Sequence, residues 1–188
     1  MKGNVIMRII SGKYKGKIIE GFDIQGTRPT HDRVKESMFA MIQNDILEST
    51  CLDLFAGSGS LGIEAISNGN QKTYFVDNNL ECISILKRNL KDIPDSNYQI
   101  LNMDYLKALD YFYENKISFD IIFLDPPYKL ECISNILKSV IQKNLLNEDG
   151  LVVCEYEFDC FQDNYLDLEL IKERKYGYKN IRIYRKKQ

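Results

Sequence analysis

The chain has 188 residues, of which 44% are hydrophobic and 28% charged, and these values are ordinary for one soluble globular domain. The composition excludes collagen-like, disulfide-scaffold and strongly disordered classes, and no stretch reaches the roughly 18 apolar residues that a membrane helix needs. The five cysteines include no Cys-x-x-Cys pair and there is one histidine, so we expect free thiols, a cytoplasmic protein and no metal site.

The formal net charge of −2 conceals an uneven distribution of charge along the chain. Residues 1–40 carry a net charge of +4, residues 41–171 carry −13 and residues 172–188 carry +7. An acidic body with two basic ends predicts that the ends contact a polyanion such as a nucleic acid.

The N-terminal segment predicts a β-hairpin with a basic tip. Two short apolar runs, at 7–11 and 17–20, flank a turn that contains glycines and lysines. We expect this hairpin and the helix after it to form an extension, residues 1–45, that precedes a main domain at 46–188.

Pro29 indicates where the helix after the hairpin begins. Pro29 disfavours a helical conformation at Arg28, so an extended loop is expected there. Thr30 or Asp32 would then cap an amphipathic helix that begins near Arg33.

From residue 51 onward, apolar strands alternate with amphipathic helices. The expected strands are 51–55, 73–76, 98–101, 120–124 and 151–156, and the expected helices are 61–67, 80–90, 105–113 and 133–141. Repeated β-α-β units predict a Rossmann-like α/β fold, with a mostly parallel sheet and helices on both faces. Two further strand-like runs, 168–176 and 179–184, predict an antiparallel terminal hairpin that brings the sheet to seven strands.

A glycine-rich turn follows the first of these strands. Residues Gly57–Gly62 match Gly-x-Gly-x-x-Gly between a strand and a helix, and Asp77 ends the next strand. The glycines let the backbone approach a nucleotide-containing cofactor, and a carboxylate at this place accepts hydrogen bonds from ribose hydroxyls. Asp53 lies on the strand just before the turn, where a carboxylate suits a ligand ammonium better than a phosphate. S-Adenosylmethionine (SAM) carries an ammonium and no phosphate.

The cofactor site is expected to extend to the third strand, because Asp104 follows that strand at the same edge of the sheet and can accept from an adenine amino group. Asp is also a common helix cap, which leaves a purely structural role open for it. The candidate cofactor-binding residues are Asp53, Phe55, Ala56, Gly57, Ser58, Gly59, Asp77, Asn78, Asp104 and Tyr105.

The tetrapeptide Asp125-Pro126-Pro127-Tyr128 ends the fourth strand and is the candidate catalytic segment. Ligands bind beyond the carboxyl ends of such strands, so it faces the same crevice as the glycine turn. The prolines keep the turn extended. The Asp125 carboxylate and the Pro126 carbonyl can then accept the two hydrogens of an exocyclic amine, and Tyr128 offers a ring for stacking on a base.

These motifs resemble known families. Residues 53–59 resemble the SAM-binding motif of class I methyltransferases, and residues 125–128 resemble the (Asp/Asn)-Pro-Pro-(Tyr/Phe) motif of enzymes that methylate exocyclic amines. Nearly the whole chain resembles the RsmD-type bacterial 16S ribosomal RNA guanine-N(2)-methyltransferases. The segments that carry this resemblance are Met7–Gly12, Arg28–Thr30, Asp32–Glu36, Leu52–Gly59 and Phe119–Phe123.

The resemblance implies SAM as the methyl donor and a guanine amino group of small-subunit ribosomal RNA, in a partly assembled particle, as the acceptor. We expect a monomer that uses neither a metal nor a membrane. The basic ends then become candidate RNA contacts: Lys13, Lys15, Lys17, Arg28, Arg33 and Lys35 in the extension, and Lys175, Lys179, Arg182 and Arg185 at the C-terminus.

Other functions stay open at this point. The family's motif often ends in Phe, and Tyr128 keeps methylation of adenine N6 in DNA or RNA as an alternative. A dehydrogenase is supported by the glycine pattern alone, and the sole histidine, His31, lies before the first strand of the expected sheet. A non-catalytic RNA-binding module would leave residues 125–128 unexplained.

Overall fold

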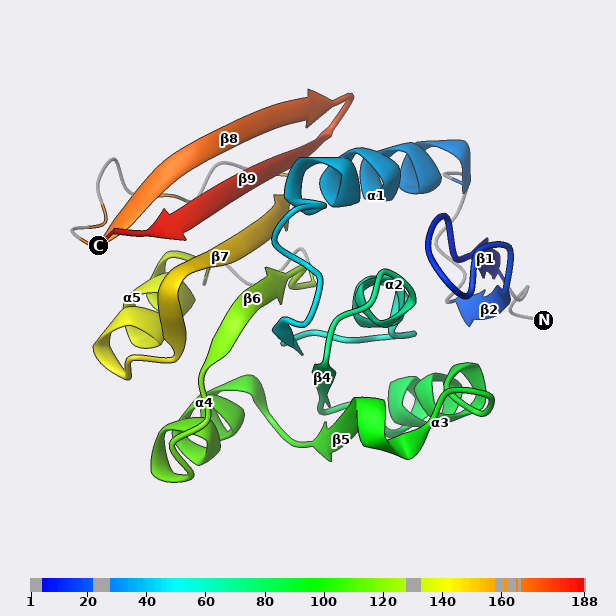
Figure 1. The fold of residues 1–188 in the computed structure, drawn as a ribbon, viewed down its shortest axis with the longest axis horizontal. Coiled ribbons are helices and arrows are strands. Elements are labelled where there is room, and N and C mark those ends of the chain that lie inside the picture. Colours follow the sequence, from blue (N-terminus) through cyan, green and yellow to red (C-terminus); the bar gives the residue numbers. More distant parts are fainter. Residues whose placement is uncertain are drawn as a thin grey trace.

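The computed structural model describes residues 5–21, 28–127, 133–157, 161, 165 and 167–187, without the side chains of 5, 6 and 28–31. Its centre is a seven-stranded sheet with helices on both faces (Figure 1). The strands are β3 (Thr50–Asp53), β4 (Lys72–Asp77), β5 (Tyr98–Asn102), β6 (Phe119–Leu124), β7 (Leu146–Tyr156), β8 (Leu168–Tyr176) and β9 (Lys179–Lys186).

The strand order in the sheet is β5-β4-β3-β6-β7-β9-β8. The first five of these strands run parallel, and β9 runs antiparallel to both β7 and β8. The expected α/β fold with an antiparallel terminal hairpin is therefore confirmed. The chain winds outward from β3 to β5 and then returns to β6 on the other side of β3, which places a topological switch point between β3 and β6.

The helices are α1 (Arg28–Ile42), α2 (Ser60–Ser67), α3 (Leu80–Asn89), α4 (Tyr105–Glu114) and α5 (Ile133–Gln142), with a 3-10 turn η1 (Asp95–Asn97). Side chains of α4 and α5 share one apolar core with one face of the sheet. Val34, Met38 and Ile42 of α1 pack with Ala65 of α2 on the opposite face. Figure 1 shows the two helical layers on either side of the twisted sheet.

Helix α2 packs against the sheet at a place where only a glycine fits. A Cβ atom built on Gly62 would lie 2.2 Å from Cε1 of Phe75, a fully buried residue of β4. This is the close helix–strand packing that the third glycine of such turns provides. The N-terminus of α2 is thereby held against the carboxyl ends of β3 and β4.

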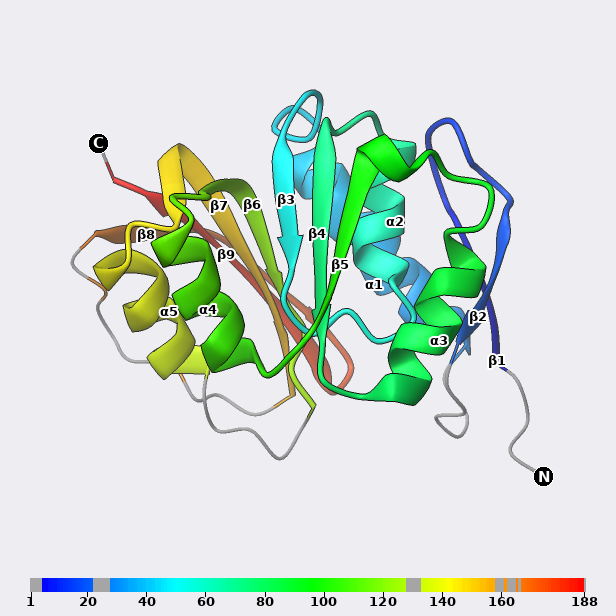
Figure 2. The same cartoon turned by 90° about the horizontal axis from the view of Figure 1, so that it is seen from below.

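The N-terminal hairpin is present as expected and forms a separate two-stranded antiparallel sheet of β1 (Val5–Arg8) and β2 (Ile18–Gly21). Ile9 and Ile19 are buried in a third core with α2 and α3 residues. The hairpin thus covers the outer side of these two helices, and Figure 2 shows it at the margin of the molecule. The division of the chain at residue 45 stays a prediction.

Two expectations about local structure were wrong. Helix α1 begins at Arg28 rather than near Arg33, because Pro29 stands in the first turn, where a missing N–H leaves no hydrogen bond unmade. Strand β7 begins at Leu146 rather than at residue 151, because Leu146 pairs with Phe119 before the register shifts. No helix of the described part of the chain is long and apolar enough to cross a membrane.

Candidate active site

The glycine turn and Asp125 lie on the two sides of the topological switch point. Leu54 to Gly59 follow β3, and Asp125 follows the last residue of β6, which is the strand paired with β3. Parallel neighbours end at the same edge of a sheet, which is where ligands bind in folds of this kind. In Figure 2 this edge lies at the bottom of the view. The structure therefore brings together the two segments that the sequence singled out.

Hydrogen bonds to Asp77 hold the glycine turn in place. One carboxylate oxygen of Asp77 accepts from the Gly57 amide at 2.8 Å, and the other accepts from the Asn79 amide at 2.8 Å. Gly59 has a φ of +83°, a left-handed conformation that favours glycine. The carboxylate expected to bind a ribose therefore also fixes the shape of the turn.

Asp53 lies beneath this turn and is 2% exposed. Its Oδ2 atom accepts a hydrogen bond from the Gly62 amide, in the first turn of α2, at 3.0 Å. The pKa of Asp53 is raised to about 7, mainly by burial, with the Gly62 hydrogen bond acting against this rise and the Asp77 carboxylate adding to it. A cation placed at this carboxylate would favour its ionised form.

Two half-buried aromatic residues belong to the candidate cofactor site, near Asp104. The rings of Phe55 and Tyr105 lie 5.3 Å apart between centroids, after β3 and at the start of α4. Asp104 caps α4 by accepting from the Leu106 amide at 2.9 Å, which is the structural role that the sequence left open for it. Asn78 is exposed beside Asp77. These residues sit at one edge of the sheet, and their contact with a cofactor stays a prediction.

The candidate catalytic segment follows β6 without a break. Asp125 is half-buried, Pro126 is buried and Pro127 is exposed, while Tyr128 lies outside the described residues. The pKa of Asp125 lies well above its ordinary value, first because the surrounding protein desolvates its carboxyl group and next because of the Glu155 carboxylate. The Lys179 ammonium acts in the opposite direction. The ionisation of Asp125 is therefore set by its surroundings.

Some basic residues predicted to contact RNA are engaged inside the protein. Lys35 is 6% exposed and pairs with buried Glu64, and Lys179 is 2% exposed and pairs with Glu155. The prediction of RNA contact was therefore wrong for Lys35 and Lys179. Their sequence neighbourhoods gave no sign of burial, because the acidic partners lie 29 and 24 residues away, on other elements.

Further predicted contacts are partly buried in ion pairs. Lys17 pairs with Asp92 at 2.8 Å, and Arg182 pairs with Glu173 at 2.8 Å. Arg33, Lys175 and the tip lysines Lys13 and Lys15 are exposed, whereas the side chain of Arg28 is not described.

The basic tip of the N-terminal hairpin lies away from the candidate active site. The Lys13 amide donates to the carbonyl of Ser67, the last residue of α2, at 2.7 Å. Helix α2 begins beside the glycine turn and is about 12 Å long, so its last residue points to the opposite edge of the sheet. Figure 2 shows the hairpin turn at that opposite edge.

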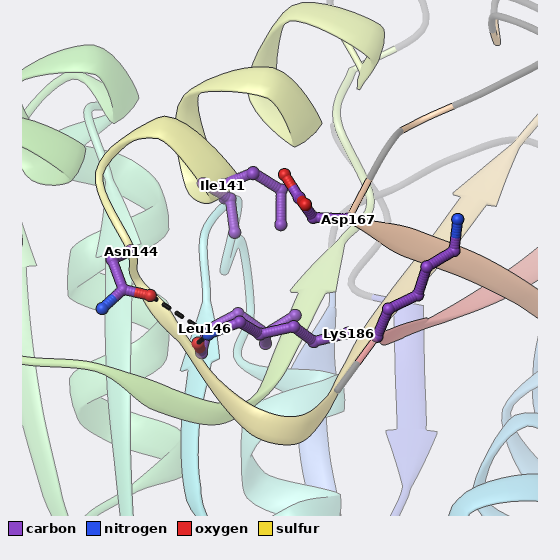
Figure 3. Close-up of a pocket in the computed structure, with 7 residues that line it drawn as sticks. Ile141, Asn144, Leu146, Asp167 and Lys186 are labelled. Carbon is purple, nitrogen blue, oxygen red and sulfur yellow. Dashed lines mark hydrogen bonds between the residues drawn. The ribbon is translucent and has the colours of Figure 1, made fainter.

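A small pocket lies elsewhere on the molecule. It has a volume of about 170 Å³ and is lined by residues of α5, β7 and β9, including Ile141, Leu146 and Lys186. Lys186 donates to the Asn144 side chain at 3.1 Å, and both residues line the pocket (Figure 3). The pocket is smaller than typical ligand sites, of roughly 300–1,000 Å³, and it contains none of the predicted site residues. Among the described residues, no group of three or more His, Cys, Asp or Glu could hold a metal ion.

The fold has close counterparts among solved structures. The structure titled "Putative methyltransferase yhhF from Escherichia coli" superposes with a TM-score of 0.84, at 25% sequence identity, over 97% of this chain and 99% of that one. An antiparallel last strand beside a parallel, doubly wound sheet is the arrangement of class I SAM-dependent methyltransferases, and this chain is a methyltransferase of that class. The dehydrogenase alternative is thereby set aside.

Sequence comparison narrows the class to a family. Residues 7–185 match the family model described as "Conserved hypothetical protein 95", and the chain belongs to this family. "Putative rRNA methyltransferase YlbH" of Bacillus subtilis is 38% identical over 183 residues, 96% of this chain and 100% of that protein. "Ribosomal RNA small subunit methyltransferase D" of Haemophilus influenzae is 35% identical over 188 residues, 97% of this chain and 94% of that protein.

Proposed function

We propose that the protein transfers a methyl group from SAM to the exocyclic N2 amine of a guanine in small-subunit ribosomal RNA. The observation that carries the proposal is the position of Asp125 and Pro126 across the switch point from the glycine turn and Asp53. The relatives named as ribosomal RNA methyltransferases, which match over almost the whole chain, support the choice of substrate.

The residues present suit the cofactor. The buried Asp53 carboxylate provides a partner for an ammonium, Asp77 lies where ribose hydroxyls would approach, and Phe55 with Tyr105 offers apolar surface to an adenine ring. When bound, SAM supplies an electrophilic methyl group on a sulfonium. Asp53 is the clearest match, because a buried carboxylate needs a positive partner to stay ionised.

The chain's own contribution to the reaction is to bind and orient the amine. Its nitrogen is a weak nucleophile, because its lone pair is delocalised into the base. Asp125 and the Pro126 carbonyl accept its two hydrogens, which directs the lone pair at the methyl carbon and stabilises the positive charge that develops on nitrogen. With SAM bound beside Asp53, transfer would form the N–C bond as the C–S bond of the sulfonium breaks, and the methylated amine would give its extra proton to solvent.

RNA contact is proposed for the exposed basic residues. Arg33 of α1 and Lys175 of β8 are exposed. Lys175 lies at the carboxyl edge of the sheet, because it pairs with Asn180, which pairs with the last residue of β7, whereas Lys13 and Lys15 are at the far end of α2. A substrate that touches both sets must be large enough to reach from one edge of the sheet to the other. This requirement favours a structured RNA or a partly assembled particle over a single base.

The test is methyl transfer from labelled SAM to unmodified small-subunit particles, naked ribosomal RNA and DNA, followed by nucleoside analysis. Label in N2-methylguanosine from the particle is the expected result. Label in N6-methyladenine would contradict the substrate and leave the class intact. Absence of label from all three substrates, with SAM bound, would contradict the proposed substrate class.

The affinity for S-adenosylhomocysteine is expected to depend on pH through Asp53. Because burial raises the pKa of Asp53 to about 7, the carboxyl is neutral below that pH and cannot pair with the ligand's ammonium. Affinity should therefore be constant above about pH 7.5 and fall by about tenfold for each pH unit below 7. Calorimetric titration between pH 5.5 and 8 measures this, and Asp53→Asn should bind weakly with a flat profile. A steep profile that survives in Asp53→Asn would contradict the assignment.

A further inference from the structure

Asp53, Asp125 and Glu155 gather at one edge of the sheet. Asp53 pairs with Phe123 of β6, and Phe123 pairs with Val153 of β7. Side chains along a strand alternate between faces, so Glu155, two positions further along β7, is on the same side as Asp53. This is the face covered by α1 and α2. Asp125 is the first residue after β6, whose last residue, Leu124, pairs with Cys154 next to Glu155, and the carboxylates of Glu155 and Asp53 both act on it. Three carboxyl groups therefore gather above the carboxyl ends of β3, β6 and β7.

A single buried lysine reaches this group from β9. Glu155 pairs with Ile181 in the antiparallel register, and Lys179, two positions earlier, is on the same face of the sheet. The Lys179 ammonium forms an ion pair with Glu155, and the two residues are 2% and 8% exposed. Lys179 is the first residue of β9, directly after the Gly177 turn, so the terminal hairpin is the element that delivers this charge.

The electrostatic surroundings of Asp125 contain more negative than positive charge. Glu155, Asp53 and Glu157 all disfavour its ionised form, and Lys179 favours it. From α1 and α2, the charged residues buried on this face are Lys35 and Glu64, which neutralise each other in a pair at 3.1 Å. Among the described residues, Lys179 is thus the cation that acts on Asp125.

We propose that Lys179 and Glu155 are positioning residues for methyl transfer, which together set how much of Asp125 is present as the carboxylate that accepts the amine. This proposal rests on the proposed function, because it assigns the pair a role in that reaction. Lys179 offsets the negative charge of Glu155 and so permits a second carboxylate, Asp125, beside it. The pair acts through Asp125 and contacts neither the base nor the methyl group.

The proposal predicts opposite pH effects for its two members. Lys179→Met removes the favourable charge, so the apparent pKa of the acidic limb of the kcat–pH profile should rise by about one unit or more. Glu155→Gln removes an unfavourable charge, so the same limb should move down. At a pH on the wild-type acidic limb, Lys179→Met should therefore be about tenfold slower than wild type. A pair with only a structural role would lower activity in both variants with no shift of the profile.

The decisive comparison repeats both substitutions in protein that also carries Asp125→Asn. The amide oxygen still accepts a hydrogen bond but does not titrate, so neither Lys179→Met nor Glu155→Gln should move the profile there. Lys179→Arg should restore the wild-type profile. Lys172→Met, in the same hairpin, is the matched control, because Lys172 is exposed and donates to the Met41 carbonyl. Shifts that persist with Asn at position 125, or shifts of the same sign in both variants, would overturn the proposal.

A second measurement separates this inference from the proposed function. In protein labelled with ¹³C at aspartate carboxyl groups, the Asp125 resonance is identified by its loss in Asp125→Asn, and it reports ionisation without any substrate. Its midpoint should be higher in Lys179→Met and lower in Glu155→Gln. If no RNA is methylated but these midpoints move as stated, the proposed function fails and the pair's control of Asp125 stands. If Lys179→Met does not fold, the downward shift in Glu155→Gln carries the test, and unchanged midpoints overturn the inference.

Discussion

Asp125→Ala is expected to lower the turnover of methyl transfer by about 10²–10³ while the affinity for S-adenosylhomocysteine stays near that of the wild type. The removed carboxylate stabilises charge that develops on the amine only in the transition state, and losses of this size are typical for such a group. The candidate cofactor residues lie on β3 and β4, in the turns after them and at the start of α4, and hydrogen bonds that do not involve Asp125 hold Asp77 and Asp104 in place. Single-turnover transfer, with binding measured separately by calorimetry, checks both parts.

Asp77→Ala should have the opposite effect, lowering the affinity for the cofactor more than the turnover. Asp77 holds the Gly57 amide at 2.8 Å, so its loss loosens the turn and weakens cofactor affinity, with turnover at saturating cofactor less affected. If Asp125→Ala retained wild-type turnover, or if both variants lost cofactor affinity equally, Asp125 would not have the role assigned to it.

The sequence predicted the elements that carry the cofactor turn and Asp125, because both segments follow short apolar strands. A buried parallel strand has a simple hydrophobic signal, and the predicted strand 120–124 differs from β6 by one residue at its start. The residues that complete the site have no such signal. Glu155 and Lys179 are adjacent only because β9 returns antiparallel beside β7, and that pairing is a property of the sheet.

The start of α1 shows a second limit of sequence reasoning. The restriction that proline places on the preceding residue argued for a loop at Arg28, whereas the structure uses Pro29 at the beginning of the helix. Both rules are physically sound, and the sequence alone does not choose between them. The buried residues Met38 and Ile42 belong to the part of the helix that was predicted in either case, so the apolar pattern did not mark where the helix begins.

Glu64 is expected to be the acidic residue on which the N-terminal hairpin most depends. It is fully buried on α2, and its carboxylate accepts from the Ile10 amide and from both the amide and the hydroxyl of Ser11 at 2.8–3.1 Å. It also pairs with Lys35 of α1, whose ammonium donates to the Ser60 hydroxyl at 3.1 Å. Glu64 thus joins the hairpin to α1, and Lys35 continues this link to Ser60, the first residue of α2.

Glu64→Leu should lower the free energy of unfolding by about 3–5 kcal/mol, because it leaves a buried lysine without a counter-charge and buried amides without an acceptor. Denaturant unfolding measures this loss. Hydrogen exchange should rise first in residues 9–17, and the affinity for S-adenosylhomocysteine should fall because Ser60 is no longer held through Lys35.

Glu20→Gln is the matched control. It breaks the exposed ion pair between Glu20 of the hairpin and Arg88 of α3, and it should change the free energy of unfolding little. Equal effects of the two substitutions would show that the hairpin is held by its apolar contacts, and that Glu64 does not couple it to the cofactor turn.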